Sequence, residues 1–199
     1  MKKNLPIYEV KIDMNDDSVG MFMISLVDEP AVEKDFYAFN QDKKFMTYKV
    51  TNTEQQKVFG LVMCADKPIY RVDETGFEYY ITYSKETIAL MAEKYFKNGF
   101  QNNVDTNHNL ILEDGITLTQ MFIKNTDKGI NPVGFEDVKD GSLFAEFHIE
   151  NQDVWNSVKD GSYKGFSLAG CFNVEEKPNE DEQVFEEIMS MLDEITKIK

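Results

Sequence analysis

Alternating apolar and polar positions predict that strands make up most of the chain. Residues 5–13 alternate, and residues 19–27 form a mostly apolar run that closes just before Pro30. Proline has no N–H for a hydrogen-bonded ladder, so pairing should end there. With the polar turn at residues 15–18 between them, the two segments predict an N-terminal hairpin.

The same pattern predicts strands in the rest of the chain. They are expected at residues 45–50, 56–64, 69–72, 77–83, 104–109, 116–124, 142–149 and 163–172. The runs at 69–72 and 77–83 flank a polar tetrapeptide that ends in Gly76, which is typical of a β-hairpin.

Helical spacing of apolar residues occurs in three segments. The first helix is expected to begin after Ser84, whose hydroxyl can cap it, and to end at Gly99. Its predicted core face consists of Ile88, Met91, Ala92, Tyr95 and Phe96. Asn151 caps a shorter helix, and a last amphipathic helix is expected over residues 183–199, after a charged linker.

These elements predict an α+β fold with a mixed, mostly antiparallel, β-barrel-like core and peripheral helices. Three segments organise the chain. Residues 1–44 hold the N-terminal hairpin and a charged connector, residues 45–175 form the barrel-like domain, and residues 176–199 hold the linker and the C-terminal helix.

Charge and motif content narrow the functional classes. The chain of 199 residues carries a formal charge of −15 at pH 7, which argues against nucleic acid and an anionic membrane as partners. No apolar run approaches the ~18 residues of a spanning helix, and the N-terminus lacks a signal-peptide pattern. These two observations predict a cytoplasmic protein. The sequence also has no nucleotide-type glycine loop and no calcium-loop spacing, so we expect no metal or cofactor.

Ser167 is the candidate nucleophile. It lies in a short apolar run bracketed by Gly165 and Gly170, where a hydroxyl either bonds to backbone or performs chemistry. The chain has two histidines, so a general base would be His108 or His148. The alternation of its strand places His148 with Phe144 and Glu146 on a face expected to be solvent-exposed or at a sheet edge, which favours a structural role.

The order of these segments resembles the phage prohead serine proteases of the XkdF-like type, which are relatives of the herpesvirus assemblin proteases. The His108 segment at 103–109 comes first, the helix and turn at 153–161 follow, and Lys164-Gly165-Phe166-Ser167 comes last. Residues 68–71 and 79–88 extend the likeness, which runs from about residue 59 to about residue 172. It implies Ser167 as nucleophile and His108 as base, on neighbouring strands with their side chains on one face, and the fold of the assemblin-like enzymes.

The segment Ile24-Ser25-Leu26-Val27-Asp28-Glu29-Pro30-Ala31 resembles the strand that follows the nucleophile strand in this family. Here it precedes the domain, which implies a circular permutation that returns the strand to the same slot. The family's third catalytic residue, a glutamate, corresponds to Met23.

Three other carboxylates are therefore candidates for orienting His108: Asp28 first, with Glu29 or Asp105 as alternatives. A Ser-His dyad held by water or a backbone carbonyl is a further alternative. The family's arginine-bearing oxyanion loop has only Lys34 here, so backbone N–H groups would have to serve.

The resemblance implies a phage or prophage head-maturation serine endopeptidase that acts in the host cytoplasm, inside the assembling head. Its expected partners are the scaffold and major capsid proteins, whose extensions it would cleave, and other copies of itself. The alternative is a catalytically inactive structural or cargo protein of the head on the same fold. A third interpretation is an unrelated β-rich binding module.

Overall fold

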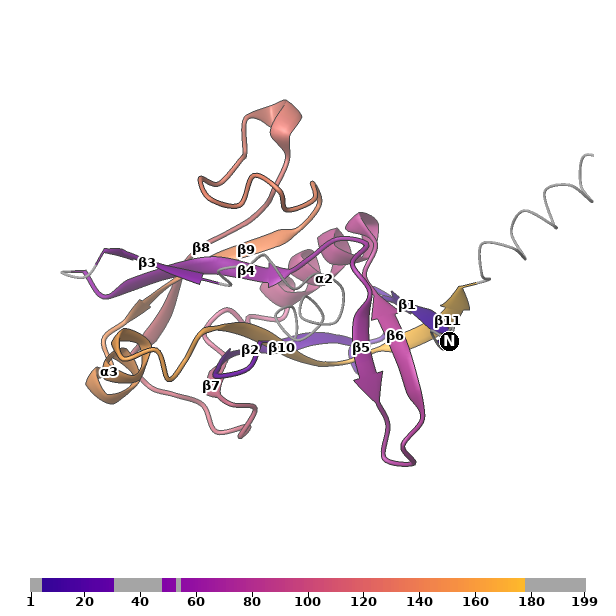
Figure 1. Ribbon diagram of the computed structural model, residues 1–199, viewed down its shortest axis with the longest axis horizontal. Coiled ribbons are helices and arrows are strands. Elements are labelled where there is room, and N and C mark those ends of the chain that lie inside the picture. The colour runs from indigo at the N-terminus through magenta and orange to yellow at the C-terminus, as the bar shows by residue number, and fades with distance from the viewer. Residues whose placement is uncertain (1–4, 31–47, 53–54, 178–199) are drawn as a thin grey trace, which may run out of the picture.

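The computed structural model describes residues 5–30, 48–52 and 55–177, and its strands form three sheets (Figure 1). The strands are β1 (Ile7–Lys11), β2 (Gly20–Val27), β3 (Tyr48–Asn52), β4 (Lys57–Met63), β5 (Ile69–Val72), β6 (Glu78–Thr82), β7 (Val104–Thr106), β8 (Ile116–Ile123), β9 (Leu143–Ile149), β10 (Gly165–Cys171) and β11 (Asn173–Lys177). The helices are α2 (Lys85–Lys97), α3 (Gln152–Lys159) and the 3-10 helix η1 (Thr126–Lys128). The mixed α+β class predicted from the sequence is confirmed.

The sheets have the strand orders β11-β1-β6-β5, β10-β2-β7 and β3-β4-β9-β8. Their pairs are antiparallel except for β1 with β6 and β2 with β7. Within the described ranges each sheet stays open, so the barrel-like closure expected from the sequence is not confirmed. The expected hairpin of β5 and β6 is confirmed by their antiparallel register.

The predicted N-terminal hairpin is wrong. Its two strands form at the expected places, but β1 and β2 belong to different sheets. β1 pairs with β11 and β6, whereas β2 pairs with β10 and β7. Alternation predicts that a segment is a strand, but it carries no information about the partner, which packing decides.

β2 occupies the centre of the second sheet. Leu26 lies opposite Phe166 and Ile24 lies opposite Leu168 in antiparallel register. The prediction that the N-terminal strand shares a sheet with the Ser167 strand is therefore confirmed. Gly170 permits their close approach at a bulge, because a Cβ there would lie 2.5 Å from the carbonyl oxygen of Gly20.

The main core draws residues from all three sheets and from both α2 and α3, whose arrangement is shown in Figure 1. α2 begins after Ser84, whose hydroxyl accepts from the Thr87 N–H, and it buries the predicted apolar face except Phe96, which is 46% exposed. α3 is capped by Asn151 and buries Val154, Trp155 and Val158.

A second apolar cluster covers the far face of the third sheet. It contains Leu61, Cys64, Phe135, Val138 and Phe144. The predicted solvent face of β9 is therefore wrong for Phe144, which is fully buried, because the loop that carries Phe135 and Val138 folds over it. The predicted C-terminal helix lies outside the described residues. Within those residues no helix is long and apolar enough to cross a membrane.

Candidate active site

Three polar residues form a row across the second sheet. Ser167 on β10 lies directly opposite Ser25 on β2, and Ser25 is in register with Asp105 on β7. Side chains at matched positions of neighbouring strands point to the same face, with Cβ atoms about 4.5–5.5 Å apart. The register therefore brings two hydroxyls and one carboxylate together.

Ser25 is the centre of this row and is fully buried, at 0% exposure. Its Oγ lies 2.9 Å from Nδ1 of His108. Ser167 is half-buried, and His108 is exposed. Within the part of the chain that the structure describes, the hydrogen bond of the imidazole goes to Ser25 and not to Ser167.

His108 lies in a turn just after β7, and not on the strand as predicted. Asn107, His108 and Leu110 all have left-handed backbone, with φ of 50°, 56° and 60°. Such backbone is uncommon for residues other than glycine, and strain of this kind concentrates at functional sites. The turn departs from strand geometry and brings the imidazole over β2, between β7 and β10.

Hydrogen bonds from two strands hold this turn. The N–H of Asn107 donates to the carbonyl of Leu26 at 2.9 Å, and the N–H of Asp28 donates to Oδ1 of Asn107 at 3.1 Å. The N–H of Leu110 donates to Oδ2 of Asp105 at 2.8 Å. The end of β2 thus fixes the segment that carries His108.

The predicted nucleophile and base are brought together less directly than expected. Ser167 and His108 were expected on neighbouring strands, but β2 separates β10 from β7. Ser25 stands between them, opposite the first and bonded to the second. The strand between them, β2, comes from the N-terminal part of the chain.

The carboxylates proposed as third member occupy different positions. Asp28 and Glu29 are exposed beyond the end of β2, and the contact of Asp28 with the histidine turn uses its backbone N–H. Asp105 is fully buried in the row. Its Oδ2 accepts from Leu110, while its Oδ1 has no hydrogen-bond partner among the described atoms.

The remaining sequence candidates lie elsewhere. Met23, the position matching the family's glutamate, is buried two residues before Ser25 and so lies on the same face of β2. His148 lies on β9 in the third sheet, opposite Thr117 and Lys57. Lys34 lies outside the described residues. No group of three or more His, Cys, Asp or Glu side chains in the described ranges could hold a metal ion.

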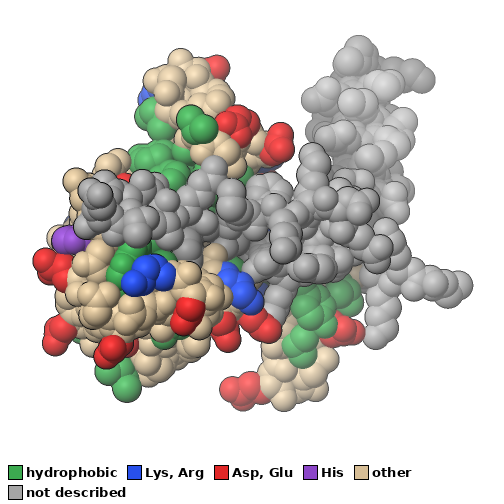
Figure 2. Space-filling view, turned by 60° about the vertical axis from the view of Figure 1, so that its left-hand side comes forward, with side chains coloured by type: hydrophobic (Ala, Val, Ile, Leu, Met, Phe, Trp, Pro, Cys, Tyr) green, Lys and Arg blue, Asp and Glu red, His purple; other side chains and the backbone are tan. Residues whose placement is uncertain are grey.

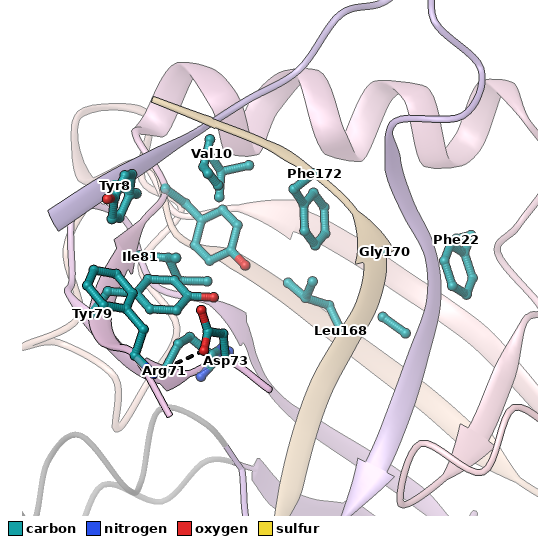
Figure 3. A pocket seen from close by; sticks show the side chains of 14 residues that line it. Tyr8, Val10, Phe22, Arg71, Asp73, Tyr79, Ile81, Leu168, Gly170 and Phe172 are labelled. Carbon is teal, nitrogen blue, oxygen red and sulfur yellow. Dashed lines mark hydrogen bonds between the residues drawn. The ribbon is translucent and has the colours of Figure 1, made fainter. Parts of the chain in front are cut away.

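A groove of about 610 Å³ adjoins β10 on the side of the first sheet (Figure 3). Aromatic and aliphatic side chains dominate its walls, which consist of Tyr8, Val10, Phe22, Arg71, Asp73, Phe77, Tyr79, Ile81, Tyr83, Leu168, Ala169, Gly170, Phe172 and Val174. Hydrogen bonds from the Thr75 hydroxyl and the backbone of Phe77 lower the pKa of Asp73. Burial raises the pKa of Tyr83 to about 12.

The groove reaches the serine strand. A small cavity of about 20 Å³ is lined by Ser167 and also by Arg71, Tyr83 and Leu168, which line the groove as well. Among the described strands, β10 lies at the edge of its sheet, so alternate backbone N–H and C=O groups point away from β2. β10 therefore contributes both the candidate nucleophile and one groove wall.

The histidine turn continues into exposed apolar residues. Leu110, Ile111 and Leu112 are 64%, 67% and 55% exposed. Figure 2 shows acidic side chains spread over one face of the molecule with few basic ones, which agrees with the net charge of −15. The three residues are consecutive, so their apolar side chains form one exposed stretch beside His108.

Ser25 is the residue that the sequence analysis missed. It belongs to the segment that carried the family likeness, but only the acids around it were considered. The available signal was a lone hydroxyl in a run of buried apolar residues, because a buried polar side chain needs a specific partner.

Comparisons with known proteins identify the family of the chain. A family model described as "Putative phage serine protease XkdF" matches residues 44–176, more than half of the 199-residue chain. No curated protein and no solved structure gives a significant match. The chain therefore belongs to this family of phage serine proteases.

Proposed function

We propose that the protein is a head-maturation serine endopeptidase that cleaves scaffold and capsid-protein extensions during phage assembly. The observation that carries the proposal is the Ser167–Ser25–Asp105 row with His108 bonded to its central member. Family membership supports the class of enzyme. The role in the head, inside the host cytoplasm, follows from the likeness to prohead proteases.

Ser167 is assigned as the nucleophile because it is half-buried, whereas Ser25 is fully buried in the central strand. A peptide carbonyl needs open approach to the attacking oxygen. Ser167 Oγ attacks the carbonyl carbon, its proton passes to Nε2 of His108, and the tetrahedral intermediate forms. Collapse expels the amine, which takes the proton from His108, and water then hydrolyses the acyl-enzyme.

The contacts of the two ring nitrogens of His108 support its role as general base. Nδ1 is engaged by Ser25, which leaves Nε2 as the nitrogen available for proton transfer. Moderate adjustment on substrate binding would close the Ser167–His108 hydrogen bond, since such bonds are often long in unliganded sites. Outward N–H groups of the β10 edge would act as oxyanion donors.

The polypeptide substrate is proposed to bind along β10 and in the adjoining groove. An edge strand can pair with an extended peptide, and side-chain pockets then select the sequence. The aromatic walls suit apolar side chains, and Arg71 suits a neighbouring carboxylate. The exposed apolar residues 110–112 would contact the substrate from the histidine side.

The test is cleavage of the cognate scaffold and capsid proteins by purified protein, with mass spectrometry of the products. A fluorophosphonate probe should label Ser167, and Ser167→Ala should abolish both labelling and cleavage. Ser162→Ala is the matched control, because Ser162 is an exposed serine five positions before the nucleophile. It should retain full activity.

A second candidate is an inactive structural or cargo protein of the head on the same fold. Met23 in place of the family's glutamate favours it. Equal inertness of wild type and Ser167→Ala toward probe and substrates, from about pH 6 to about pH 9 where histidine changes charge, would replace the protease by this alternative.

A further inference from the structure

We propose that Ser25 is a positioning residue that connects His108 to Asp105 and so sets the tautomer of the imidazole. The proposal rests on the protease function and deepens it by naming what takes the place of the missing glutamate. It stands on two independent observations: the 2.9 Å contact between Ser25 Oγ and Nδ1 of His108, and the buried, unpartnered Oδ1 of Asp105.

The contact between Ser25 Oγ and Nδ1 of His108 allows a hydrogen bond in either direction. A hydroxyl can donate to Nδ1 or accept from it. If Ser25 donates, Nε2 carries the ring proton and cannot accept a proton from Ser167. If Ser25 accepts, Nδ1 carries the ring proton, and Nε2 is free to act as base.

Asp105 selects the second direction. Its carboxylate lies in register with Ser25 on the neighbouring strand, and both side chains are fully buried. A buried carboxylate oxygen without a partner is costly. The structure contains no hydrogen bond between Ser25 and Oδ1 of Asp105, so we propose that a side-chain rotation, which the shared register allows, closes it. With its proton turned toward Asp105, Ser25 presents its oxygen to the Nδ1–H of His108.

The proposed hydrogen-bond chain runs from Asp105 through Ser25 and His108 to Ser167, and its central link, between Ser25 and His108, is present in the structure. No net proton transfer from His108 to Ser25, or from Ser25 to Asp105, is needed. When His108 takes the proton of Ser167, the positive imidazolium remains hydrogen-bonded to Ser25. The negative charge of Asp105, on the other side of Ser25, stabilises the imidazolium. The backbone N–H of Leu110 donates to Oδ2 of Asp105 and holds the carboxylate in place.

The test reads the tautomer directly by long-range ¹H–¹⁵N NMR of the imidazole rings at a pH where they are neutral. The chain has two histidines, so His148→Gln assigns the spectrum, and His148 is an internal reference. We expect Nδ1 of His108 to be protonated in the wild type. In Ser25→Ala the preference should shift toward the Nε2–H form that is usual for free histidine.

Asp105→Asn sharpens the test. The amide oxygen can still accept from Leu110, which turns the NH₂ group toward Ser25. Ser25 then accepts from the amide and donates to Nδ1, so the tautomer of His108 should reverse. Ser142→Ala is the control, because Ser142 is an equally buried serine in a different part of the fold, and it should leave the His108 spectrum unchanged.

The kinetic counterpart is a loss of kcat/KM of roughly 10²-fold in Ser25→Ala, mainly in kcat, since Ser25 is out of reach of substrate. The loss in Asp105→Asn should be larger, approaching the ~10⁴-fold caused by a wrong tautomer in a related geometry. Ser25→Thr retains the hydroxyl and should recover part of the rate and the wild-type tautomer.

Several results would overturn the proposal. These are an Nε2–H tautomer in the wild type, a tautomer that is the same in wild type, Ser25→Ala and Asp105→Asn, and fluorophosphonate labelling of Ser25. The NMR measurement needs no catalytic activity. An inert protein with the expected tautomer shifts would therefore reject the protease function while retaining the positioning of His108 by Ser25.

Discussion

Two buried polar clusters in this protein differ in how completely their hydrogen bonds are satisfied. Lys124, 2% exposed, donates from Nζ to the carbonyl oxygens of Phe135, Glu136 and Val138 at 2.9, 2.8 and 2.6 Å. An ammonium group has three donors, and all three are used. The cluster holds the loop that covers the third sheet and has no group left for a ligand.

The row around Ser25 is the opposite case. Asp105 is as deeply buried as Lys124, yet one carboxylate oxygen has no partner among the described residues. The neighbouring turn has left-handed backbone at three residues other than glycine. A buried polar cluster whose hydrogen bonds are all made indicates a structural role. A buried charged group that lacks a hydrogen-bond partner and lies beside strained backbone indicates a cluster whose hydrogen bonds are completed during function.

The largest effect should come from His108→Gln. We expect the cleavage rate to fall by about 10³-fold or more, since general-base catalysis and the linked activation of serine are lost together. The free energy of unfolding should fall by about 1 kcal/mol, because the buried hydroxyl of Ser25 loses its hydrogen bond to the imidazole. The matched His148→Gln variant should cleave at the wild-type rate. Equal rates for both variants would contradict the assignment of the base.

Lys124→Met tests the other cluster. The methionine fills the space but removes the ammonium donors from three carbonyls, of which the Phe135 carbonyl keeps its bond from the Val138 N–H, so we expect a loss of about 2 kcal/mol in the free energy of unfolding. Urea denaturation measures it, and the activity per folded molecule should remain unchanged. A loss below about 1 kcal/mol would show that the carbonyls find other partners, and the contrast between the clusters would weaken.

Alkaline pH should affect stability through buried tyrosine. Burial raises the pKa of Tyr83 to about 12, so the folded state holds this proton more tightly than the unfolded state does. The contribution is complete below the unfolded pKa of about 10 and is lost as pH rises toward 12, on the order of 2 kcal/mol. Urea denaturation at pH 8, 10 and 11 should show this decline (values chosen to span about 10, the tyrosine pKa).

Tyr83→Phe is the control for that decline and should reduce its slope. Burial also raises the pKa of Tyr95, so part of the slope should remain. An unchanged slope in Tyr83→Phe would assign the alkaline sensitivity to other groups.

The smallest expected effect is that of Tyr95→Phe. The hydroxyl of Tyr95 is buried without a hydrogen-bond partner among the described atoms, like Oδ1 of Asp105, but it lies in the core packing of α2. Removing it should leave stability unchanged or raise it by up to about 1 kcal/mol, with no change in activity. A clear loss of stability would reveal a partner, such as a buried water molecule.

Much of the local structure could be predicted from the sequence. The caps Ser84 and Asn151 give the helices their starts, and alternation places most strands to within a few residues. The exception is β11, which was not predicted and whose last residues lie where a charged linker was expected to begin. Local signals of this kind depend only on neighbouring residues. The family likeness correctly placed β2 beside β10, which no local pattern could have done.

Pairing and burial on a second face could not be predicted in this way. Phe144 was expected to face solvent because its strand alternates, and only the distant residues Phe135 and Val138 bury it. His108 was expected on a strand, but the left-handed turn after Thr106 moves it off. Ser25 acquires its partner from a residue 83 positions away, which no spacing rule reports.

The central place of β2 has a consequence for the time at which the site forms. Ser25 lies near the start of the chain, and Ser167 near the end of the described part, so the row exists only after almost the whole domain has been synthesised. Contacts this distant in sequence close late in folding, since the loop entropy must be overcome first. A nascent or partly unfolded chain therefore has no assembled nucleophile, base and orienting group. Under the proposed protease function, this dependence ties cleavage to completed folding.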